Sequence, residues 1–252
     1  MHDLFKTLLL LLALPVAAQT APAPENSGAN ASITRGASGK YAYRATDGRA
    51  RGEERFQLMV HPDGSRTMLM WHDLFARNAQ FSVTLRVDAD YRPLDAFVSY
   101  WNGGAYKGAS RITVDGADLA VNYRGPAGEV EQELAVPEHF SLGTHPVAGD
   151  GWHVANFDAA AGGTQMLRLA SVEASADATR PVLVTLVPLK VERLGSERVT
   201  VGAGTFDTTH YRLAGVNDIW VLEQDLLVVK SAMTARGLEY ELTELTRNAG
   251  HL

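Results

Sequence analysis

The sequence predicts an all-β, mainly antiparallel domain: a curved sheet, half-barrel or barrel-like meander of roughly 10–12 strands with one short helical insert. Apolar and polar residues alternate with a period of two through much of the chain. Turn signals separate the alternating runs at intervals of roughly 10–15 residues, which leaves no room for a crossover helix between strands. Consecutive antiparallel strands are therefore expected to follow one another along the chain.

The alternation is clearest in the N-terminal half of the domain. Phe81, Val83, Leu85 and Val87 alternate with polar residues, which is typical of a strand with one buried face. The same pattern predicts strands at residues 68–71, 96–101 and 119–123. Asp-Gly and Asn-Gly pairs, which supply the positive φ angles of tight hairpins, stand at Asp47-Gly48, Asp63-Gly64, Asn102-Gly103 and Asp115-Gly116.

The pattern breaks between Pro137 and Gly163, where we expect a loop and a short helix that cross one end of the sheet. Val147, Trp152 and Val154 can share one side of that helix, although nearby glycines weaken it. Strands are expected again at residues 166–169, 182–191, 199–201, 206–213, 219–222, 226–229 and 238–242. The run at 182–191 is almost continuously apolar, which predicts a central strand buried on both faces.

Residues 1–18 have the features of a secretory signal peptide. Lys6 precedes an apolar run that is shorter than the roughly 20 residues of a membrane-spanning helix. Val16 and Ala18 are small residues at the positions that signal cleavage requires, so we expect cleavage after Ala18 and a periplasmic protein. Residues 19–36 are rich in Ala, Pro, Asn, Ser and Gly, which predicts a flexible leader before a single β domain over residues 37–246.

Composition excludes several classes of protein. The 252-residue chain has no cysteine, which excludes disulfide scaffolds, zinc–thiolate sites, iron–sulfur clusters and thiol catalysis. Its formal net charge of -6 argues against a nucleic-acid partner. No apolar run after the signal is long enough to span a bilayer, and no cofactor motif occurs. We therefore expect neither a transmembrane segment in the mature chain nor a cofactor.

The closing segment carries a more specific pattern. A valine strand, Val199-Thr200-Val201, runs into the turn Ala203-Gly204-Thr205-Phe206. A strand with Trp220 follows, and the final strand is Gly237–Leu242. This pattern resembles a family of uncharacterised bacterial periplasmic proteins, which is similar to the half-barrel group that includes the lipoprotein carriers LolA and LolB. The resemblance implies a curved antiparallel sheet with a concave apolar face, and it implies no catalytic residue.

A first candidate site is the cluster of His145, Asp150, His153 and Asp158. Imidazole and carboxylate groups suit a divalent metal such as zinc, and a His–Asp pair can act as an acid–base catalyst. The spacing of the four residues matches no established ligand motif. We therefore expect no metal here, with Asp150 capping the helix and His153 facing solvent.

The neighbouring residues His72 and Asp73 form another histidine–carboxylate combination. Because adjacent residues of a strand point to opposite faces, we do not expect these two to cooperate.

A second candidate is a ligand-binding surface of methionine and aromatic side chains. Methionine adapts to irregular apolar ligands, and tryptophan buries a large area with one polar group. On a curved sheet such side chains either line a cavity for an acyl chain or fill an ordinary core. The residues expected to bind the ligand are Met68, Met70, Trp71, Phe97, Trp101 and Trp220.

These observations favour a non-catalytic periplasmic binding or carrier protein whose partner is an apolar small molecule or lipid. Two alternatives stay open. The first is an exported enzyme that uses His145, Asp150 and His153, and the second is a structural envelope module with a filled core.

Overall fold

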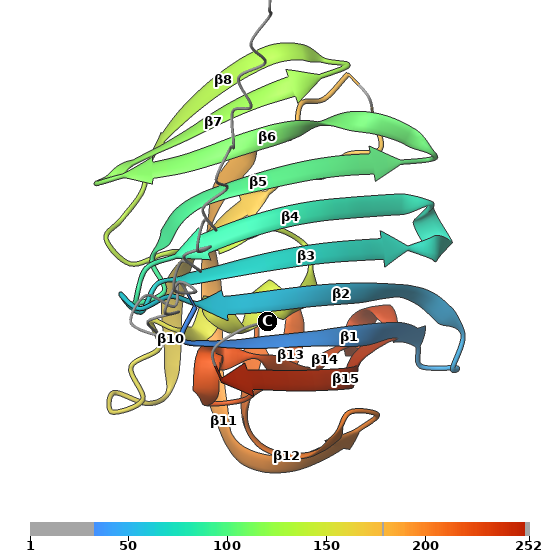
Figure 1. Cartoon of the computed structure of the whole chain (residues 1–252), viewed down its shortest axis with the longest axis vertical. Helices are drawn as coiled ribbons and strands as arrows, with labels where there is room; N and C mark the ends of the chain where they lie inside the picture. The colour runs from blue at the N-terminus through green and yellow to red at the C-terminus, as the bar shows by residue number, and fades with distance from the viewer. Residues whose placement is uncertain (1–32, 178, 250–252) are drawn as a thin grey trace, which may run out of the picture. The chain divides into compact units, whose positions relative to one another are not determined.

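The computed structural model describes residues 33–177 and 179–249, which form one sheet of 15 strands (Figure 1). The predicted signal peptide and most of the predicted leader lie outside the described residues. The strands are β1 (Arg35–Ala45), β2 (Ala50–Val60), β3 (Arg66–Leu74), β4 (Ala79–Val87), β5 (Pro93–Asn102), β6 (Ala105–Asp115), β7 (Asp118–Gly125), β8 (Gly128–Ala135), β9 (Ser141–Gly143), β10 (Thr164–Val172), β11 (Val184–Val201), β12 (Gly204–Leu213), β13 (Asn217–Val221), β14 (Val228–Met233) and β15 (Leu238–Ala249). Short 3-10 helices are η1 (Phe75–Arg77), η2 (Val147–Val154), η3 (Gln224–Leu226) and η4 (Thr234–Arg236).

The sheet is a meander in which the first and last strands lie side by side. Strands β8 to β1 stand in reverse chain order, β1 pairs with β15, and β15 to β9 complete the row. The ladders are antiparallel except the one between β9 and β10. The predicted all-β antiparallel class is therefore confirmed. The strand number exceeds the expected range partly because β8 (Gly-Glu-Val-Glu-Gln-Glu-Leu-Ala) is mostly polar and β9 has only three residues, so neither gives an apolar pattern.

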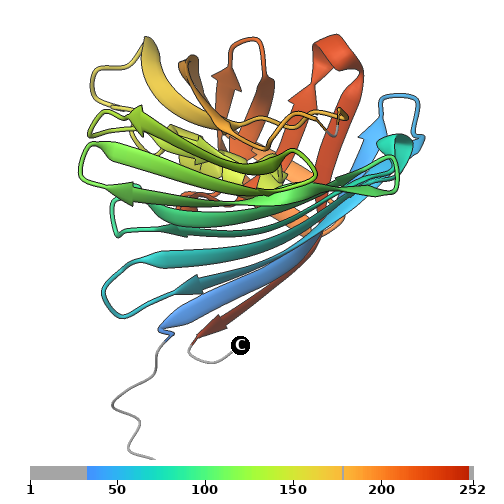
Figure 2. The ribbon, with the colours of Figure 1, turned by 90° about the horizontal axis from the view of Figure 1, so that it is seen from above.

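The sheet curls until its β8 end approaches β11 (Figure 2). The side-chain amide of Gln132 on β8 donates to the carbonyl of Val184 at 2.8 Å and accepts from the N–H of Val184 at 3.0 Å. The Ser110 hydroxyl of β6 donates to the carbonyl of Val182. Side chains therefore bridge the two parts of the sheet where no backbone ladder closes a barrel, and β8 and β9 stay as the edge strands.

The interior of the curl is filled by η2, the helical insert that was predicted between Pro137 and Gly163. Val147, Ala148 and Trp152 of this helix are buried in the main core. The indole N–H of Trp152 donates to the carbonyl of Asp225 at 3.0 Å. The inner face of the sheet thus packs on a helix rather than on a large apolar cavity.

One expected strand differs from the structure. β11 runs for 18 residues and joins the two segments expected at 182–191 and 199–201. Its side chains Thr185, Pro188 and Lys190 are exposed, so the expectation of a strand buried on both faces is wrong. β11 lies near the β9 end of the sheet, where its outer face meets solvent and carries the residues that interrupt the apolar run.

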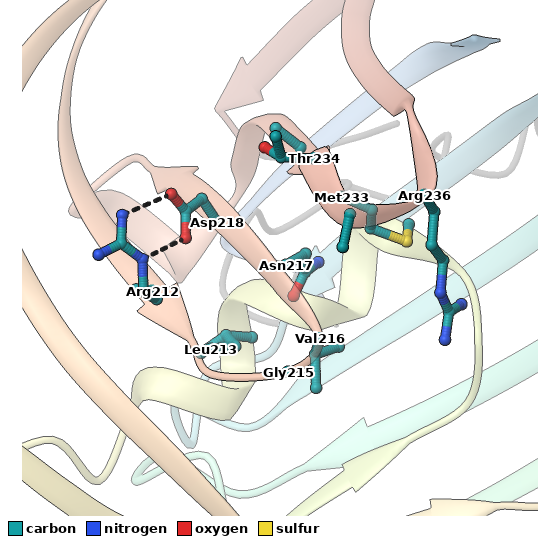
Figure 3. Close-up of a pocket in the computed structure, with 11 residues that line it drawn as sticks. Arg212, Leu213, Gly215, Val216, Asn217, Asp218, Met233, Thr234 and Arg236 are labelled. Carbon is teal, nitrogen blue, oxygen red and sulfur yellow. Dashed lines mark hydrogen bonds and ion pairs between the residues drawn. The ribbon is translucent and has the colours of Figure 1, made fainter. Parts of the chain in front are cut away.

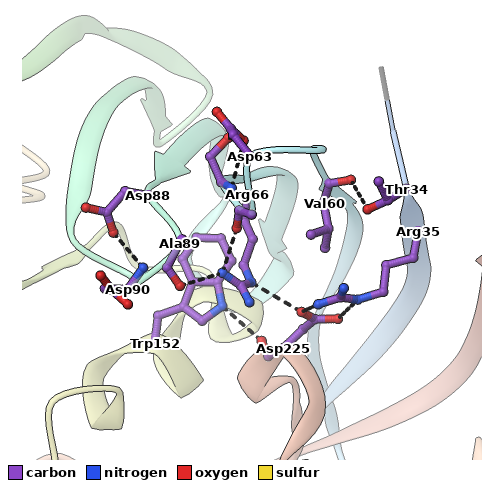
Figure 4. Close-up of polar contacts among 12 residues, drawn as sticks. Thr34, Arg35, Val60, Asp63, Arg66, Asp88, Ala89, Asp90, Trp152 and Asp225 are labelled. Carbon is purple, nitrogen blue, oxygen red and sulfur yellow. Dashed lines mark hydrogen bonds and ion pairs between the residues drawn. The ribbon is translucent and has the colours of Figure 1, made fainter. Parts of the chain in front are cut away.

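A buried carboxylate joins η3 to two strands (Figure 4). Asp225 accepts hydrogen bonds from Nε of Arg35 on β1 at 3.0 Å and from Nε of Arg66 on β3 at 3.2 Å. Burial raises the pKa of Asp225, but the two guanidinium groups outweigh this effect and hold the pKa below its ordinary value. Asp225 and Leu226 both adopt left-handed backbone angles, with φ of 59° and 51°. The ion pairs therefore hold a strained turn in place.

Candidate binding site

Glu54 is a fully buried carboxylate on the inner face of β2. It accepts hydrogen bonds from the backbone N–H groups of Val147 at 2.7 Å and Ala148 at 2.9 Å, in the first turn of η2. The hydroxyl of Tyr43 donates to the same carboxylate. A buried carboxylate is unfavourable unless it is hydrogen bonded, so these donors account for its presence and fix η2 to the sheet.

His72 lies opposite Glu54 in the β2–β3 ladder. Its Nδ1 is 2.8 Å from the Tyr43 hydroxyl oxygen and 3.3 Å from Glu54 Oε2. Because Tyr43 donates its only hydroxyl proton to Glu54, its oxygen accepts from Nδ1–H of His72, and this network assigns the tautomer. The other ring nitrogen, Nε2, is buried and has no hydrogen-bond partner. Its lone pair is therefore left without a hydrogen bond.

His72 contributes to the wall of a small recess, called here the cationic recess, of about 140 Å³. Its walls come from the ends of β2, β3, β14 and β15, from η1 and η4, and from the loop before η2. The lining residues are Arg51, His72, Leu74, Ala76, Arg77, His145, Met233, Arg236, Leu238 and Tyr240. The three arginines have no ion pair within the described residues.

Aromatic rings stack into the wall of this recess. Tyr240 lies against Tyr43 with ring centroids 3.9 Å apart, and Tyr43 meets the His72 ring edge-on at 4.9 Å. Phe81 in turn contacts His72 and stacks on His145 at 4.7 Å. Stacked rings have few alternative rotamers, so the wall presents His72 and His145 in fixed positions.

His145 stands in the recess wall with its side chain accessible to solvent. Its backbone is left-handed, with φ of 78°, which is uncommon for a residue with a side chain. Its Nε2 lies 2.9 Å from the Val172 carbonyl and donates to it. Although part of the side chain meets solvent, the ring stacks on Phe81, and its desolvation together with the nearby His72 lowers the pKa of His145 to about 4. His145 is therefore neutral at neutral pH.

A larger recess of about 390 Å³ adjoins the first (Figure 3). The two recesses share Met233 and Arg236, and we call them together the end groove. Leu213, Val216 and Ala235 contribute apolar surface to the larger recess. Its other lining residues are Arg212, Gly215, Asn217, Asp218, Ala232 and Thr234, of which Arg212 and Asp218 form a two-bond ion pair at 3.0 and 3.1 Å.

The residues of the first candidate site are brought together only in part. His153 Nε2 lies 3.5 Å from Asp150 Oδ1, and Asp150 also accepts from the side-chain amide of Asn217 at 3.2 Å. His145 instead faces the cationic recess. Asp158 accepts from the N–H of Ala160 at 2.9 Å. The described residues contain no group of three or more histidine and acidic side chains that could hold a metal ion.

Two expectations about this helix are wrong. His153 is only 6% exposed, so it does not face solvent. The N-cap of η2 is Pro146, and Asp150 lies inside the helix without capping it. His153 is buried because the sheet curls around η2, and Asp150 does not cap the helix because η2 already begins at Val147.

The six residues expected to bind an apolar ligand lie on different surfaces. Met68 and Met70 are buried on the inner face. Trp71, Phe97 and Trp101 lie on the outer face and are 57%, 50% and 36% exposed. Trp220 stacks on His210 at 4.1 Å and donates to Glu197 at 2.6 Å. The six residues do not line a common pocket, and their role in ligand binding stays a prediction.

The strand periodicity correctly separated His72 from Asp73. Trp71 is exposed, His72 is 4% exposed, and Asp73 contacts Gln80 instead of the histidine. The partner of His72, Glu54, was missed. A signal for it was present, because Glu54 stands in phase with Phe56 and Leu58, which are buried. A charged residue in the buried phase of a strand indicates a polar network.

None of the helices in the described residues has both the length and the hydropathy to cross a membrane. No protein-family model matches the sequence, and no curated protein matches it.

Solved structures are similar in fold. A β-barrel-like protein of the DUF1849 domain of unknown function from Brucella abortus covers 85% of this chain and 97% of its own, with 12% identity and a TM-score of 0.51. The match to a DUF1089 protein from Pseudomonas aeruginosa covers 70% of this chain and 87% of that protein, with 14% identity and a TM-score of 0.41. The match to a candidate lipoprotein from Parabacteroides distasonis covers 84% of this chain and 95% of that protein, with 12% identity and a TM-score of 0.33. The first of these similarities shows a barrel-like fold, and at such identity it extends to the fold alone.

Proposed function

We propose that this chain is a periplasmic, non-catalytic binding or carrier protein for a lipid-like ligand, and that the ligand lies in the end groove. The observation that carries the proposal is the pairing of two adjoining recesses that differ in character. The larger has a volume of about 390 Å³, within the range of small-molecule sites, and has apolar side chains such as Val216 and Met233. The smaller is cationic. An amphiphile matches both parts.

The sequence supports the same proposal in two ways. The signal-peptide features of residues 1–18 favour export to the periplasm, where lipid-like molecules need carriers to cross water. The resemblance of the segment from Val199 to Leu242 to the LolA/LolB-like group also favours a carrier. The end groove takes the place of the concave apolar face that the resemblance implies, because η2 fills the interior.

Thermal unfolding with ligands of increasing chain length tests the proposal. Each methylene buried contributes about 0.8 kcal/mol, so longer alkyl phosphates should raise Tm more than short ones. Ligand at 100 times its Kd should stabilise the fold by about 2.7 kcal/mol. Met233→Ser should reduce the shift, whereas Met166→Ser should leave it unchanged. Met166 is a matched control because it is 62% exposed and lies outside the groove.

The same experiment tests the outer-face residues. If Trp101→Ala abolishes the shift and Met233→Ser does not, the apolar ligand lies on the outer face and the end groove is the wrong location. If chain length has no effect on Tm in the unmodified protein, the lipid-like ligand itself is refuted.

A further inference from the structure

The cationic recess holds positive charge that its own residues do not balance. Arg51, Arg77 and Arg236 line it without an ion pair in the described part of the chain. All three act on the hydroxyl of Tyr240: burial and the carboxylate of Asp150 raise the pKa of this tyrosine, and the three guanidinium groups oppose that rise. Three cationic side chains therefore converge on one small volume.

The carboxylate behind the recess does not neutralise this charge by direct contact. Both oxygens of Glu54 are engaged by the N–H groups of Val147 and Ala148, and the Tyr43 hydroxyl also donates to it. Among the described residues Glu54 forms no ion pair with an arginine, and it is linked to the recess wall through His72. The arginines are thus left to an external anion.

His72 supplies a second and independent indication of a ligand. Its side chain is 4% exposed, and its Nε2 has no partner although it belongs to a residue of the recess wall. Leaving a buried polar atom unsatisfied is unfavourable, so such atoms usually have a partner. Nδ1 is committed to Tyr43 and Glu54, which holds the ring in place. Nε2 can accept a hydrogen bond from a ligand hydroxyl, or donate one when the ring is protonated.

We propose that the cationic recess is a phosphate-binding site, occupied by inorganic phosphate or by the phosphate monoester headgroup of a lipid. This inference deepens the proposed function and rests on it only for the lipid source of the phosphate. A phosphate monoester carries a charge of about −1.5 to −2 and three acceptor oxygens, which suits several guanidinium donors better than a carboxylate does. A protonated phosphate oxygen can also donate to Nε2 of His72. The volume of about 140 Å³ admits a small anionic group, and the adjoining recess of about 390 Å³ leaves room for an attached apolar chain.

Calorimetric titration of the mature protein with inorganic phosphate at low ionic strength tests the site. We expect saturable binding with one phosphate per chain. Arg77→Gln and Arg236→Gln should each weaken it about tenfold, because each removes a charge-assisted hydrogen bond. Both side chains are exposed, so the variants should keep their thermal stability. The matched control is Arg168→Gln, an exposed arginine of β10 outside the recess, which should keep the wild-type affinity.

Nitrogen NMR of the imidazole tests the contact with His72 without a substitution in the core. Phosphate should shift the Nε2 resonance of His72 and leave that of the exposed His139 unchanged. A second titration, with a long-chain alkyl phosphate below its micelle concentration, distinguishes the two sources. Tighter binding than that of inorganic phosphate supports a lipid headgroup, and equal binding supports the free anion.

Absence of phosphate binding at millimolar concentration would overturn the inference. Equal weakening by Arg77→Gln and Arg168→Gln would also overturn it, because it would show general attraction to surface charge. The proposed function fails separately: phosphate binding without any chain-length effect keeps the anion site and refutes the lipid-like ligand. If uncharged alkyl alcohols bind with an affinity that depends on chain length and phosphate does not bind, the lipid-like ligand is kept and the phosphate site is refuted.

Discussion

Gln132 of β8 hydrogen bonds through its side-chain amide to both the N–H and the carbonyl of Val184, the first residue of β11. A neighbouring strand would normally make these two bonds. The side chain of Gln132 therefore replaces the backbone of a neighbouring strand at this junction. It satisfies the N–H and the carbonyl of Val184 near an edge of the sheet. The curl of the sheet around η2 depends on such contacts between distant strands.

Replacing Gln132 with alanine should lower the free energy of unfolding by about 2 kcal/mol, because two hydrogen bonds are lost and the backbone of Val184 is left without partners. Urea denaturation measures this. Glu131→Ala is the control, since Glu131 is the exposed neighbour on the same strand and should change stability by less than about 0.5 kcal/mol. Equal effects from the two variants would show that the bridge does not hold the curl.

The ion pairs of Asp225 should contribute more to stability than an exposed pair. Asp225→Asn leaves Arg66, which is 11% exposed, without its charged partner, and we expect a loss of about 3 kcal/mol. Asp95→Asn breaks the exposed pair with Arg86 and should cost less than about 1 kcal/mol. Chemical denaturation at neutral pH compares the two variants. If Asp225→Asn lowered the free energy of unfolding no more than Asp95→Asn does, the ion pairs of Asp225 would contribute no more than an exposed pair.

His145 should make stability depend on pH in the acid range. Its pKa is about 4 in the folded chain, against an ordinary value of 6.5, so the unfolded chain binds more protons between these values. The free energy of unfolding therefore falls as pH drops from 6.5 to 4, and the contribution of His145 is fully present above pH 6.5. His145→Asn, in which asparagine tolerates the left-handed backbone, should flatten this slope.

Denaturation curves at several pH values measure the effect. His139→Asn is the control, because His139 is exposed, and its replacement should leave the slope unchanged. An unchanged slope in His145→Asn would mean that another group causes the acid sensitivity.

The strands could be predicted because their signals are local. Alternation at Phe81, Val83 and Leu85 reports one buried face, and glycine pairs mark the turns. How the sheet curls could not be predicted in this way. The contact of Gln132 with Val184 joins residues 52 positions apart, and no local pattern marks either partner.

The candidate site was predicted only in fragments for the same reason. His145 was identified as a candidate, but its neighbours His72, Arg51 and Arg236 come from three other segments of the chain. The expectation for His153 failed because nothing in the segment from Pro137 to Gly163 shows that the sheet encloses it. Alternation did predict that His72 and Asp73 face opposite sides of the sheet, and the structure has His72 buried in phase with Met70.

Two glycines in η2 give the sharpest test of how tightly this helix is enclosed. A Cβ atom on Gly151 would lie 1.8 Å from the carbonyl oxygen of Leu226, far inside contact distance, whereas one on Gly149 would lie 3.7 Å from the sulfur of Met70, at ordinary contact. Leu226 cannot easily move, because the adjacent Asp225 is held by its ion pairs.

Gly151→Ala should therefore destabilise the fold by more than about 3 kcal/mol, since the backbone of either η2 or η3 must shift. Gly149→Ala should change stability by less than about 1 kcal/mol, because alanine favours the helix and finds space. Urea denaturation compares the stability of the two variants. Near-ultraviolet circular dichroism reports on the surroundings of Trp152, whose indole N–H contacts the turn at Asp225. If both variants were equally stable, η2 would be free to move within the curl, and the fixed position of Glu54, which the N–H groups of the first turn of η2 hold, would have to be abandoned.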